Sequence, residues 1–215
     1  MSELQTSISQ SSIPRVGITG GIGSGKSLVC RIFEETFGIP IFYADIWAKK
    51  LINFDPEIKA GLIALFGPEA YLESGEYNRS YIAQIAFSEP KKLAALNALV
   101  HPAVERVSLE WHEEQARLGH PYTLKEAALM VESGSHQHLD YLIVVAAPVE
   151  LRIQRVMERD GLTEEQVQAR MRGQLPEEDK LKLADFIILN DGSQLLLPQV
   201  LGVHQAIMND SIDSI

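Results

Sequence analysis

The feature that most constrains the fold is the segment Gly20–Ser27, which fits the phosphate-binding pattern G-x-x-x-x-G-K-[ST] at every required position. Before it, the short apolar run Arg15–Thr19 predicts a buried strand. After it, apolar side chains recur at helical spacing, at Leu28, Ile32, Phe33 and Phe37. A strand, a glycine-rich loop and a helix therefore follow one another, and this order predicts an α/β fold that binds a nucleoside triphosphate.

The chemistry expected of this loop is the binding of a nucleoside triphosphate and Mg²⁺. Main-chain N–H groups would converge on the phosphates at the start of the helix, where the helix dipole also favours negative charge. Lys26 would reach the β- and γ-phosphates, and the hydroxyl of Ser27 would bind Mg²⁺. A glycine-rich turn can serve packing alone, but packing does not explain a Lys-Ser pair at this spacing. The nucleotide-binding residues of the loop are expected to be Gly21, Ile22, Gly23, Ser24, Gly25, Lys26 and Ser27.

Four more apolar segments predict strands, at residues 38–43, 122–130, 141–147 and 186–189. Helical patterns separate most of these strands, which is typical of a parallel sheet with helices on both faces. Between the second and third strands, four consecutive helices are expected, at Pro56–Phe66, Arg79–Phe87, Pro90–Val100 and Pro102–Leu118, with Asn78 and Ser88 as N-caps. A capping box of Thr163 and Gln166 is expected to start a later helix. The predicted fold class is a three-layer α/β P-loop fold with a five-stranded parallel sheet, a helical insertion and a lid.

This pattern divides the chain into several parts. We expect a nucleotide-binding core, a helical insertion that binds the acceptor and a lid, between a disordered N-terminus and a C-terminal tail. The core comprises residues 14–54, 119–150 and 183–208, the helical insertion residues 55–118, and the lid residues 151–182. The N-terminus and the tail are residues 1–13 and 209–215.

Composition limits the functional class. A net charge of −10 argues against nucleic acid or an anionic membrane as the main partner. Cys30 is the single cysteine, so no internal disulfide can form, and we interpret it as a small core residue. No apolar run approaches the length of a membrane span, and no secretion signal is evident. A cytoplasmic enzyme is therefore expected, and the sequence does not indicate its oligomeric state.

Asp45 is the expected general base. It follows the second strand, which in this fold class lies near the phosphate loop, and its carboxylate could accept a proton from an acceptor hydroxyl. The alternative is that Asp45 only caps the helix that it precedes. No strand ends in an aspartate after the usual apolar run, so Mg²⁺ could rely on Ser27, phosphate oxygens and water. In that case Asp45, Glu126 or Glu132 could contribute from the outer coordination shell.

Five arginines crowd the segment after the fourth strand, at positions 152, 155, 159, 170 and 172. Their planar side chains suit phosphate oxygens, so a mobile lid is expected here, with Arg155 and Arg159 on one helix face. The alternative is a solvated charged surface. At the end of the fifth strand, Asn190 could meet an adenine edge or simply form a turn. His101, at a predicted helix start, could bind the acceptor or be structural.

The chain resembles the dephospho-coenzyme A kinase family over nearly its whole folded length. The resemblance rests on residues 17–27, Ala44-Asp45, Asn78-Arg79 with Ile82 and Phe87, Leu96-Asn97, His101-Pro102, Leu129–Glu132, Arg155, Arg159-Asp160-Gly161, Gln174 and residues 184–190. It implies ATP-dependent phosphorylation of the ribose 3′-hydroxyl of dephospho-coenzyme A. It also implies catalytic roles for Lys26, Asp45 and Arg155, nucleotide binding by Leu28, Arg159 and Asn190, and acceptor binding by Asp45, Arg79, His101 and Glu132.

Three positions depart from the family pattern: Tyr43 replaces an aspartate, Leu28 a threonine, and Ala128 a proline. The base role therefore rests on Asp45 alone. Two other functions stay open. One is a different small-molecule kinase of this fold, acting on a nucleotide or on shikimate. The other is a nucleotide-dependent switch, although the N-K-x-D and D-x-x-G motifs that it requires are missing.

Overall fold

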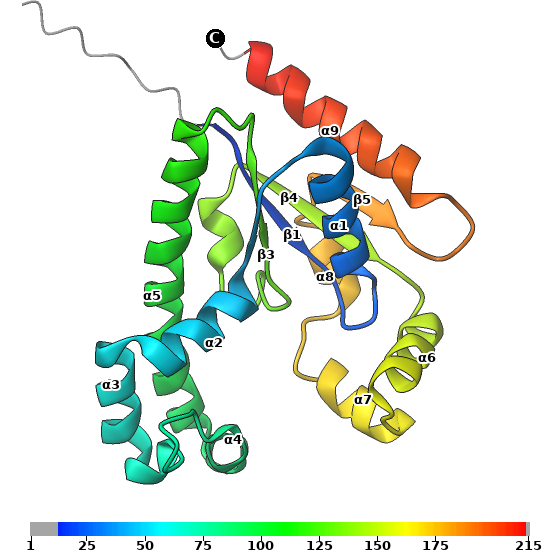
Figure 1. The fold of residues 1–215 in the computed structure, drawn as a ribbon. Coiled ribbons are helices and arrows are strands. Elements are labelled where there is room, and N and C mark those ends of the chain that lie inside the picture. The colour runs from blue at the N-terminus through cyan, green and yellow to red at the C-terminus, as the bar shows by residue number, and fades with distance from the viewer. Residues whose placement is uncertain (1–12, 214–215) are drawn as a thin grey trace, which may run out of the picture.

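The computed structural model describes residues 13–213 and contains a parallel five-stranded sheet with the order β2-β3-β1-β4-β5 (Figure 1). The strands are β1 (Arg15–Thr19), β2 (Ile41–Tyr43), β3 (Thr123–Glu126), β4 (Tyr141–Ala146) and β5 (Phe186–Leu189). All five strand predictions and the fold class are confirmed. The third strand is shorter than expected, because the chain leaves the sheet after Glu126 and residues 127–134 form turns.

Side chains of successive strand residues enter two different cores, which creates three layers. In β4, Ile143 and Val145 pack toward α1 (Lys26–Phe37) and α9 (Leu196–Asp213). The alternate residues Leu142 and Val144 pack toward Met130 and Leu181 on the opposite face. Cys30 is buried in the first of these cores, and burial raises the pKa of its thiol far above the usual range. The prediction that Cys30 is a core residue is therefore confirmed.

A helical block between β2 and β3 has a hydrophobic core of its own, centred on Leu62 and Phe66. It consists of α2 (Ala44–Phe54), α3 (Pro56–Phe66), the short 3₁₀ helix η1 (Pro68–Ala70), α4 (Arg79–Ser88) and α5 (Pro90–Arg117). Asn78 caps α4 as predicted, since its Oδ1 accepts a hydrogen bond from the N–H of Tyr81.

Two predictions for this block are wrong. We expected Pro102 to start a new helix, but it lies inside α5, a single helix of 28 residues. A proline inside a helix loses one hydrogen bond, yet Val100 and Val104 on either side are buried in the core of the block and hold the helix together. Ser88 is not an N-cap either. It is the last residue of α4, and its hydroxyl donates to the carbonyl groups of Gln84 and Ile85.

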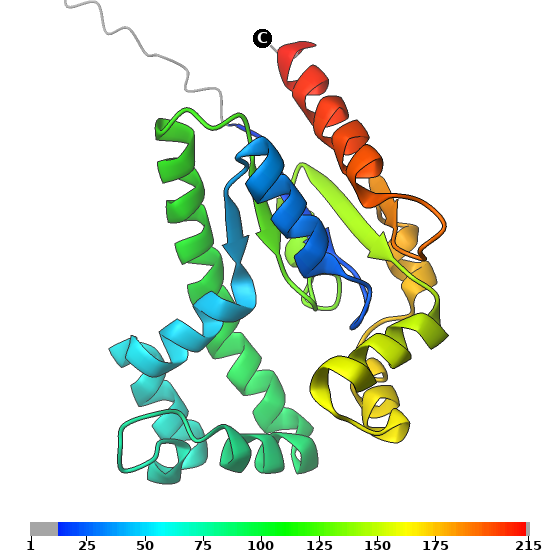
Figure 2. The same cartoon turned by 45° about the vertical axis from the view of Figure 1, so that its right-hand side comes forward.

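The arginine-bearing segment forms three helices, α6 (Val149–Asp160), α7 (Glu164–Met171) and α8 (Glu177–Leu181). The predicted capping box of Thr163 and Gln166 is present at the start of α7. In Figures 1 and 2, the α6–α7 pair and the helical block lie on opposite sides of the carboxyl ends of the strands. Residues 135–138 form a second 3₁₀ helix, η2 (Ser135–His138), before β4.

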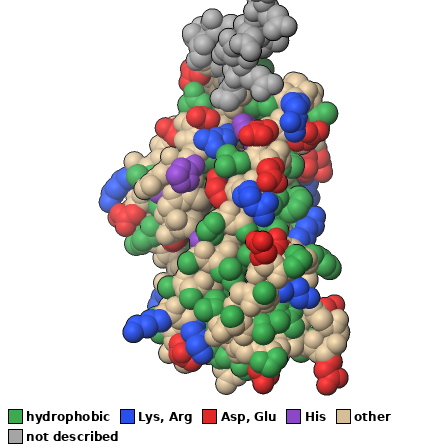
Figure 3. Space-filling model, turned by 90° about the vertical axis from the view of Figure 1, so that its left-hand side faces the viewer, with side chains coloured by type: hydrophobic (Ala, Val, Ile, Leu, Met, Phe, Trp, Pro, Cys, Tyr) green, Lys and Arg blue, Asp and Glu red, His purple; other side chains and the backbone are tan. Residues whose placement is uncertain are grey.

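The ends of the chain are only partly described. Residues 1–12, which make up nearly all of the predicted disordered N-terminus, lie outside the described residues. At the other end, α9 continues to Asp213, beyond the position where we expected the tail to begin. None of the helices between residues 13 and 213 is both long enough and apolar enough to cross a membrane. On the face shown in Figure 3, basic, acidic and apolar side chains are interspersed.

Candidate active site

The phosphate loop joins β1 to α1 at the carboxyl edge of the sheet, and its close packing requires glycine at two positions. Gly25 is the N-cap of α1 with a φ of 95°, and a Cβ atom there would collide with the side-chain amide of Asn190. Gly23 has a φ of 80°, and a Cβ atom there would lie 2.5 Å from the carbonyl oxygen of Arg152. Both positions use backbone angles that side chains disfavour. The loop is therefore shaped by neighbours from β5 and α6.

The side chain of Lys26 is hydrogen-bonded to the backbone of this loop. Its Nζ atom donates to the carbonyl oxygen of Gly20 at 2.9 Å and lies 3.4 Å from that of Gly21. The residue is only 9% exposed, and burial lowers the pKa of its ammonium group, although the negative charges of Glu126 and Asp45 oppose this shift. The ammonium group is thus held at the loop by carbonyl oxygens, close to two carboxylates.

Glu126 is the central carboxylate of the site. It ends β3 and pairs in register with Ile18 of β1 and Tyr43 of β2, so it lies between the phosphate loop and the start of α2. Burial raises the pKa of Glu126, the charge of Lys26 lowers it, and the charge of Asp45 raises it further. From the sequence, Glu126 was expected only in the outer coordination shell of a metal ion. Its position at the end of a strand beside β1 was the available signal, but the order of the strands was needed to interpret it.

Asp45 is exposed in the first turn of α2 and does not cap that helix. The N-cap is Tyr43, and no side chain makes a capping hydrogen bond there. The alternative interpretation of Asp45 as a helix cap is therefore wrong. Its carboxylate instead affects the pKa values of both Lys26 and Glu126, and its side chain lines a cavity. Asp45 therefore acts electrostatically on Lys26 of the phosphate loop and also lines this cavity.

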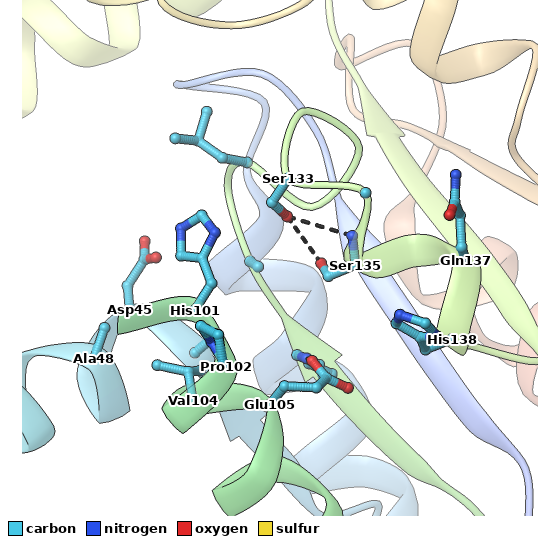
Figure 4. A pocket seen from close by; sticks show the side chains of 15 residues that line it. Asp45, Ala48, His101, Pro102, Val104, Glu105, Ser133, Ser135, Gln137 and His138 are labelled. Atoms are coloured by element: carbon cyan, nitrogen blue, oxygen red, sulfur yellow. Dashed lines mark hydrogen bonds and ion pairs between the residues drawn. The ribbon is translucent and has the colours of Figure 1, made fainter. Parts of the chain in front are cut away.

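The cavity has a volume of about 440 Å³ and lies between α2, α5, β3 and the segment from Ala127 to His138 (Figure 4). Its polar lining includes Asp45, His101, Glu105, Lys125, Ser133 and His138. Lys125 and Glu105 form an ion pair in its wall. Burial lowers the pKa of the His101 imidazole, and the charge of Lys125 lowers it further. Both effects favour the neutral form of the His101 imidazole, which lines the cavity together with Lys125 and Glu105.

Arg155, for which the sequence predicted a catalytic role, and Asn190, for which it predicted nucleotide binding, both contact the phosphate loop. The Nδ2 atom of Asn190 donates to the carbonyl oxygen of Ser24 at 2.8 Å. The guanidinium group of Arg155 makes longer contacts, at 3.5 Å to the carbonyl oxygen of Gly23 and at 3.4 Å to Asn190 Oδ1. Arg159 is exposed, and its guanidinium group pairs with Asp160 at 2.7 Å. The structure therefore brings Arg155 and Asn190 to the loop and pairs Arg159 elsewhere.

Arg152 is a loop contact that the sequence analysis did not single out from the other arginines. The residue is 6% exposed, and a Cβ atom at Gly21 would collide with its Nη1 atom. The same Nη1 atom lies 3.8 Å from Glu177 Oε1 in α8. A buried guanidinium group therefore lies directly against the phosphate loop, where it adds positive charge.

Glu132 and Arg79, both expected to bind the acceptor, are not among the residues that line the cavity. Glu132 Oε1 lies 2.8 Å from Lys180 Nζ, and Lys180 is 1% exposed. The same oxygen accepts a hydrogen bond from the N–H of Leu175 at 2.8 Å. Glu132 thus joins the segment after β3 to α8. Arg79 is an exposed residue at the start of α4, in the helical block.

Comparison with known proteins identifies the family to which this site belongs. A family model described as dephospho-CoA kinase matches residues 15–195. The chain belongs to the dephospho-CoA kinase family. A relative from Chlorobaculum tepidum, named dephospho-CoA kinase, is 44% identical over 198 residues, which cover 90% of this chain and 94% of the relative.

Solved structures support the same assignment. A crystal structure of a Thermus thermophilus protein is 39% identical, with a TM-score of 0.79, and the match covers 90% of this chain and 97% of that one. The dephospho-CoA kinase from Campylobacter jejuni is 27% identical, with a TM-score of 0.67, and the match covers 91% of this chain and 98% of that one. The resemblance noted in the sequence is confirmed. A different small-molecule kinase or a nucleotide switch is not favoured.

Proposed function

We propose that this protein transfers the γ-phosphoryl group of ATP to the ribose 3′-hydroxyl of dephospho-coenzyme A, which completes the synthesis of coenzyme A. The observation that carries this proposal is the position of Asp45. Its carboxylate interacts electrostatically with Lys26 of the phosphate loop and also lines the 440 Å³ cavity. A group at this junction can contact an acceptor hydroxyl in the cavity while a triphosphate occupies the loop.

On the donor side, N–H groups of the phosphate loop other than that of Ile22, which donates to Gln174, bind the phosphates together with the side chain of Lys26. In the structure Lys26 Nζ is hydrogen-bonded to the loop carbonyl groups, so only a short movement would carry it to phosphate oxygens. Arg155 and the buried Arg152 add positive charge on the side of α6, where negative charge spreads over the transferred phosphoryl group. Asn190 supports the loop from β5.

The residues at the loop suit Mg²⁺, which prefers oxygen ligands and keeps several waters. Ser27 offers an exposed hydroxyl at the start of α1, and the buried carboxyl group of Glu126 lies near Lys26. Ser27, phosphate oxygens and water would hold the ion, and the described residues contain no group of three or more His, Cys, Asp or Glu side chains that could hold a metal. When bound, the ion would neutralise charge on the β- and γ-phosphates.

On the acceptor side, Asp45 removes the proton of the 3′-hydroxyl while the 3′-oxygen of the acceptor attacks the γ-phosphorus. The bond between that phosphorus and the bridging oxygen breaks, ADP leaves, and the proton remains on the Asp45 carboxyl group until water accepts it. His101 and Lys125 line the same cavity and offer hydrogen bonds and positive charge to a phosphate-bearing acceptor. Glu132 acts indirectly in this proposal, by fixing the wall of the cavity through Lys180.

The proposal also assigns roles to the parts of the chain. Residues 55–118 support the acceptor site through α5, which supplies His101 and Glu105 to the cavity. Residues 151–182 serve as a lid that brings arginine side chains to the phosphate loop, and Arg152 and Arg155 are its contacts with the loop. A cytoplasmic location stays a prediction from the sequence.

A coupled assay of ADP release tests this function. The protein, ATP and Mg²⁺ are mixed with dephospho-coenzyme A, with shikimate or with nucleoside monophosphates, and the product is identified by mass spectrometry. We expect strong stimulation by dephospho-coenzyme A alone and a product of the mass of coenzyme A. Strong turnover of another acceptor, with no stimulation by dephospho-coenzyme A, would reject the proposal.

A further inference from the structure

Gln174 joins the phosphate loop to the wall of the acceptor cavity. It lies in the turn between α7 and α8. Its Oε1 atom accepts a hydrogen bond from the N–H of Ile22, in the phosphate loop, at 2.8 Å. Its Nε2 atom donates to the carbonyl oxygen of Ala128 at 3.2 Å. The neighbours of Ala128 in the chain, Ala127 and Leu129, both line the acceptor cavity. One side-chain amide therefore spans the two halves of the site.

This pair of hydrogen bonds requires a primary amide. The N–H of Ile22 needs an acceptor and the carbonyl oxygen of Ala128 needs a donor, so the two partners fix the orientation of the Gln174 amide. A glutamate at this position could accept but not donate, and it would add negative charge beside the phosphates. A methionine has a similar length and shape but can replace neither bond.

Residues that follow Gln174 in the chain make several contacts with other elements. The N–H of the next residue, Leu175, donates to Glu132 Oε1, and that oxygen also pairs with the buried Lys180. Farther along, Glu177 lies 3.8 Å from Arg152 of α6. These contacts attach residues 174–180 both to the segment after β3 and to the base of α6. The backbone beside Gln174 is therefore held at a place from which its side chain reaches both substrate sites.

We propose that Gln174 is a positioning residue that couples the donor site to the acceptor site. Since Ile22 lies in the loop that binds the phosphates, binding of ATP fixes the Gln174 amide, which in turn fixes the Ala127–Leu129 wall of the cavity. The acceptor then binds more tightly when the nucleotide is present, and its hydroxyl is held in line with the γ-phosphate. This inference rests on the proposed function, because it concerns the same two sites.

The test compares Gln174→Met with Gln174→Glu and with a matched control, Gln168→Met. Gln168 is an exposed residue of α7 that bonds only to Glu164 of the same helix in the contacts described. For each variant, kcat and both KM values are measured by ADP release. Calorimetry then gives the dissociation constant of dephospho-coenzyme A with and without a non-hydrolysable ATP analogue. Thermal unfolding reports stability separately.

We expect the analogue to tighten binding of dephospho-coenzyme A to the wild type by about 5-fold or more, the usual lower range of coupling between sites. Gln174→Met should bring this ratio close to one and lower kcat by about 10- to 100-fold, as expected when reacting groups are slightly misplaced. Gln174→Glu should lose the coupling too, and Gln168→Met should retain it.

Two results would overturn this inference. One is a wild type that binds dephospho-coenzyme A equally well with and without the analogue. The other is a Gln174→Met variant whose unfolding temperature falls while its kcat and its coupling ratio stay normal, since the amide would then only stabilise the fold. Failure of the proposed function is distinguishable from both, because it appears in the wild type as an absence of turnover with dephospho-coenzyme A.

Discussion

Asn190 Nδ2 donates to the carbonyl oxygen of Ser24 at 2.8 Å, so the residue that follows β5 supports the phosphate loop directly. The Oδ1 atom of Asn190 accepts a longer hydrogen bond from Arg155. The backbone N–H of Asn190 donates to the carbonyl oxygen of Ala146 at the end of β4. The loop therefore depends on a residue that is 166 positions away in the chain. Because this separation in the chain is so long, the sequence near the loop does not show all of the residues that hold the loop in place.

Replacing Asn190 should weaken nucleotide binding. In Asn190→Ala the Ser24 carbonyl group loses its donor and Arg155 loses a partner, which at about 1–1.5 kcal/mol for a lost hydrogen bond predicts an increase of roughly 10-fold in KM for ATP. Steady-state kinetics with varied ATP would measure this change. Asn209→Ala, an exposed position in α9, is the control and should behave as wild type. An unchanged KM in Asn190→Ala would show that the loop does not need this support.

Removing the charge of Glu126 should stabilise the protein and reduce its activity. Burial is the largest influence on the pKa of Glu126 and raises it, so its ionised form is unfavourable in the folded protein without ligands. Removal of about 1 kcal/mol of this cost in Glu126→Gln predicts an unfolding temperature roughly 2–4 °C higher for a chain of this size. We also expect kcat to fall, because a negative charge beside Lys26 is lost.

Calorimetry and ADP release would test this pair of effects together. Glu113→Gln, which changes an exposed glutamate of α5, is the matched control and should alter neither quantity. A less stable Glu126→Gln protein would contradict the inference that the ionised carboxyl group is destabilising. Unchanged turnover would show that Glu126 has no role in phosphoryl transfer.

The pair of Glu132 and Lys180 should make stability depend on pH in the acidic range. Burial alone would raise the pKa of Glu132, but hydrogen bonds from Lys180 and from backbone N–H groups outweigh it, so the pKa lies below its ordinary value of 4.5. A carboxyl group of this kind stabilises the fold above its unfolded pKa, and the stabilisation is lost as the pH falls through the folded pKa. The wild type should therefore lose stability as the solution is acidified below pH 4.5.

Urea unfolding at several pH values would measure this loss. Glu132→Gln should be less stable at neutral pH, since it leaves the buried Lys180 without a carboxylate, and its stability should vary less on acidification. Glu158→Gln, at an exposed site in α6, should follow the wild type. Parallel pH profiles for the wild type and Glu132→Gln would contradict the assigned role of the pair.

The sheet and the phosphate loop could be predicted from the sequence because their signals are local. Apolar runs of four to nine residues indicate strands, and Gly20–Ser27 carries its own chemistry. The continuous helix α5 could not be predicted in this way. Pro102 is a strong local signal for a helix start. The burial of Val100 and Val104 against residues far away in the sequence, in the core of the helical block, outweighs that signal.

The site was predicted less completely, because several of its contacts join residues far apart in the chain. The sequence predicted roles for Asp45, Arg155 and Asn190, but among the five clustered arginines it pointed to Arg155 and Arg159 and not to Arg152. Only the packing of α6 against the loop makes Arg152 a contact of the phosphate loop. The family resemblance implied acceptor binding by Glu132, and nothing in the sequence indicated its ion pair with Lys180, which lies in a helix far along the chain.

Asp45 is proposed to accept the proton of the acceptor hydroxyl, and the turnover of Asp45→Asn is the measurement that decides this role. Glu57→Gln, which changes an exposed acid in the first turn of α3, is the matched control, and thermal unfolding confirms that each variant is folded. With dephospho-coenzyme A and saturating ATP, we predict that Asp45→Asn lowers kcat at least about 100-fold while KM for ATP changes little. Near-normal turnover in that variant would contradict the account.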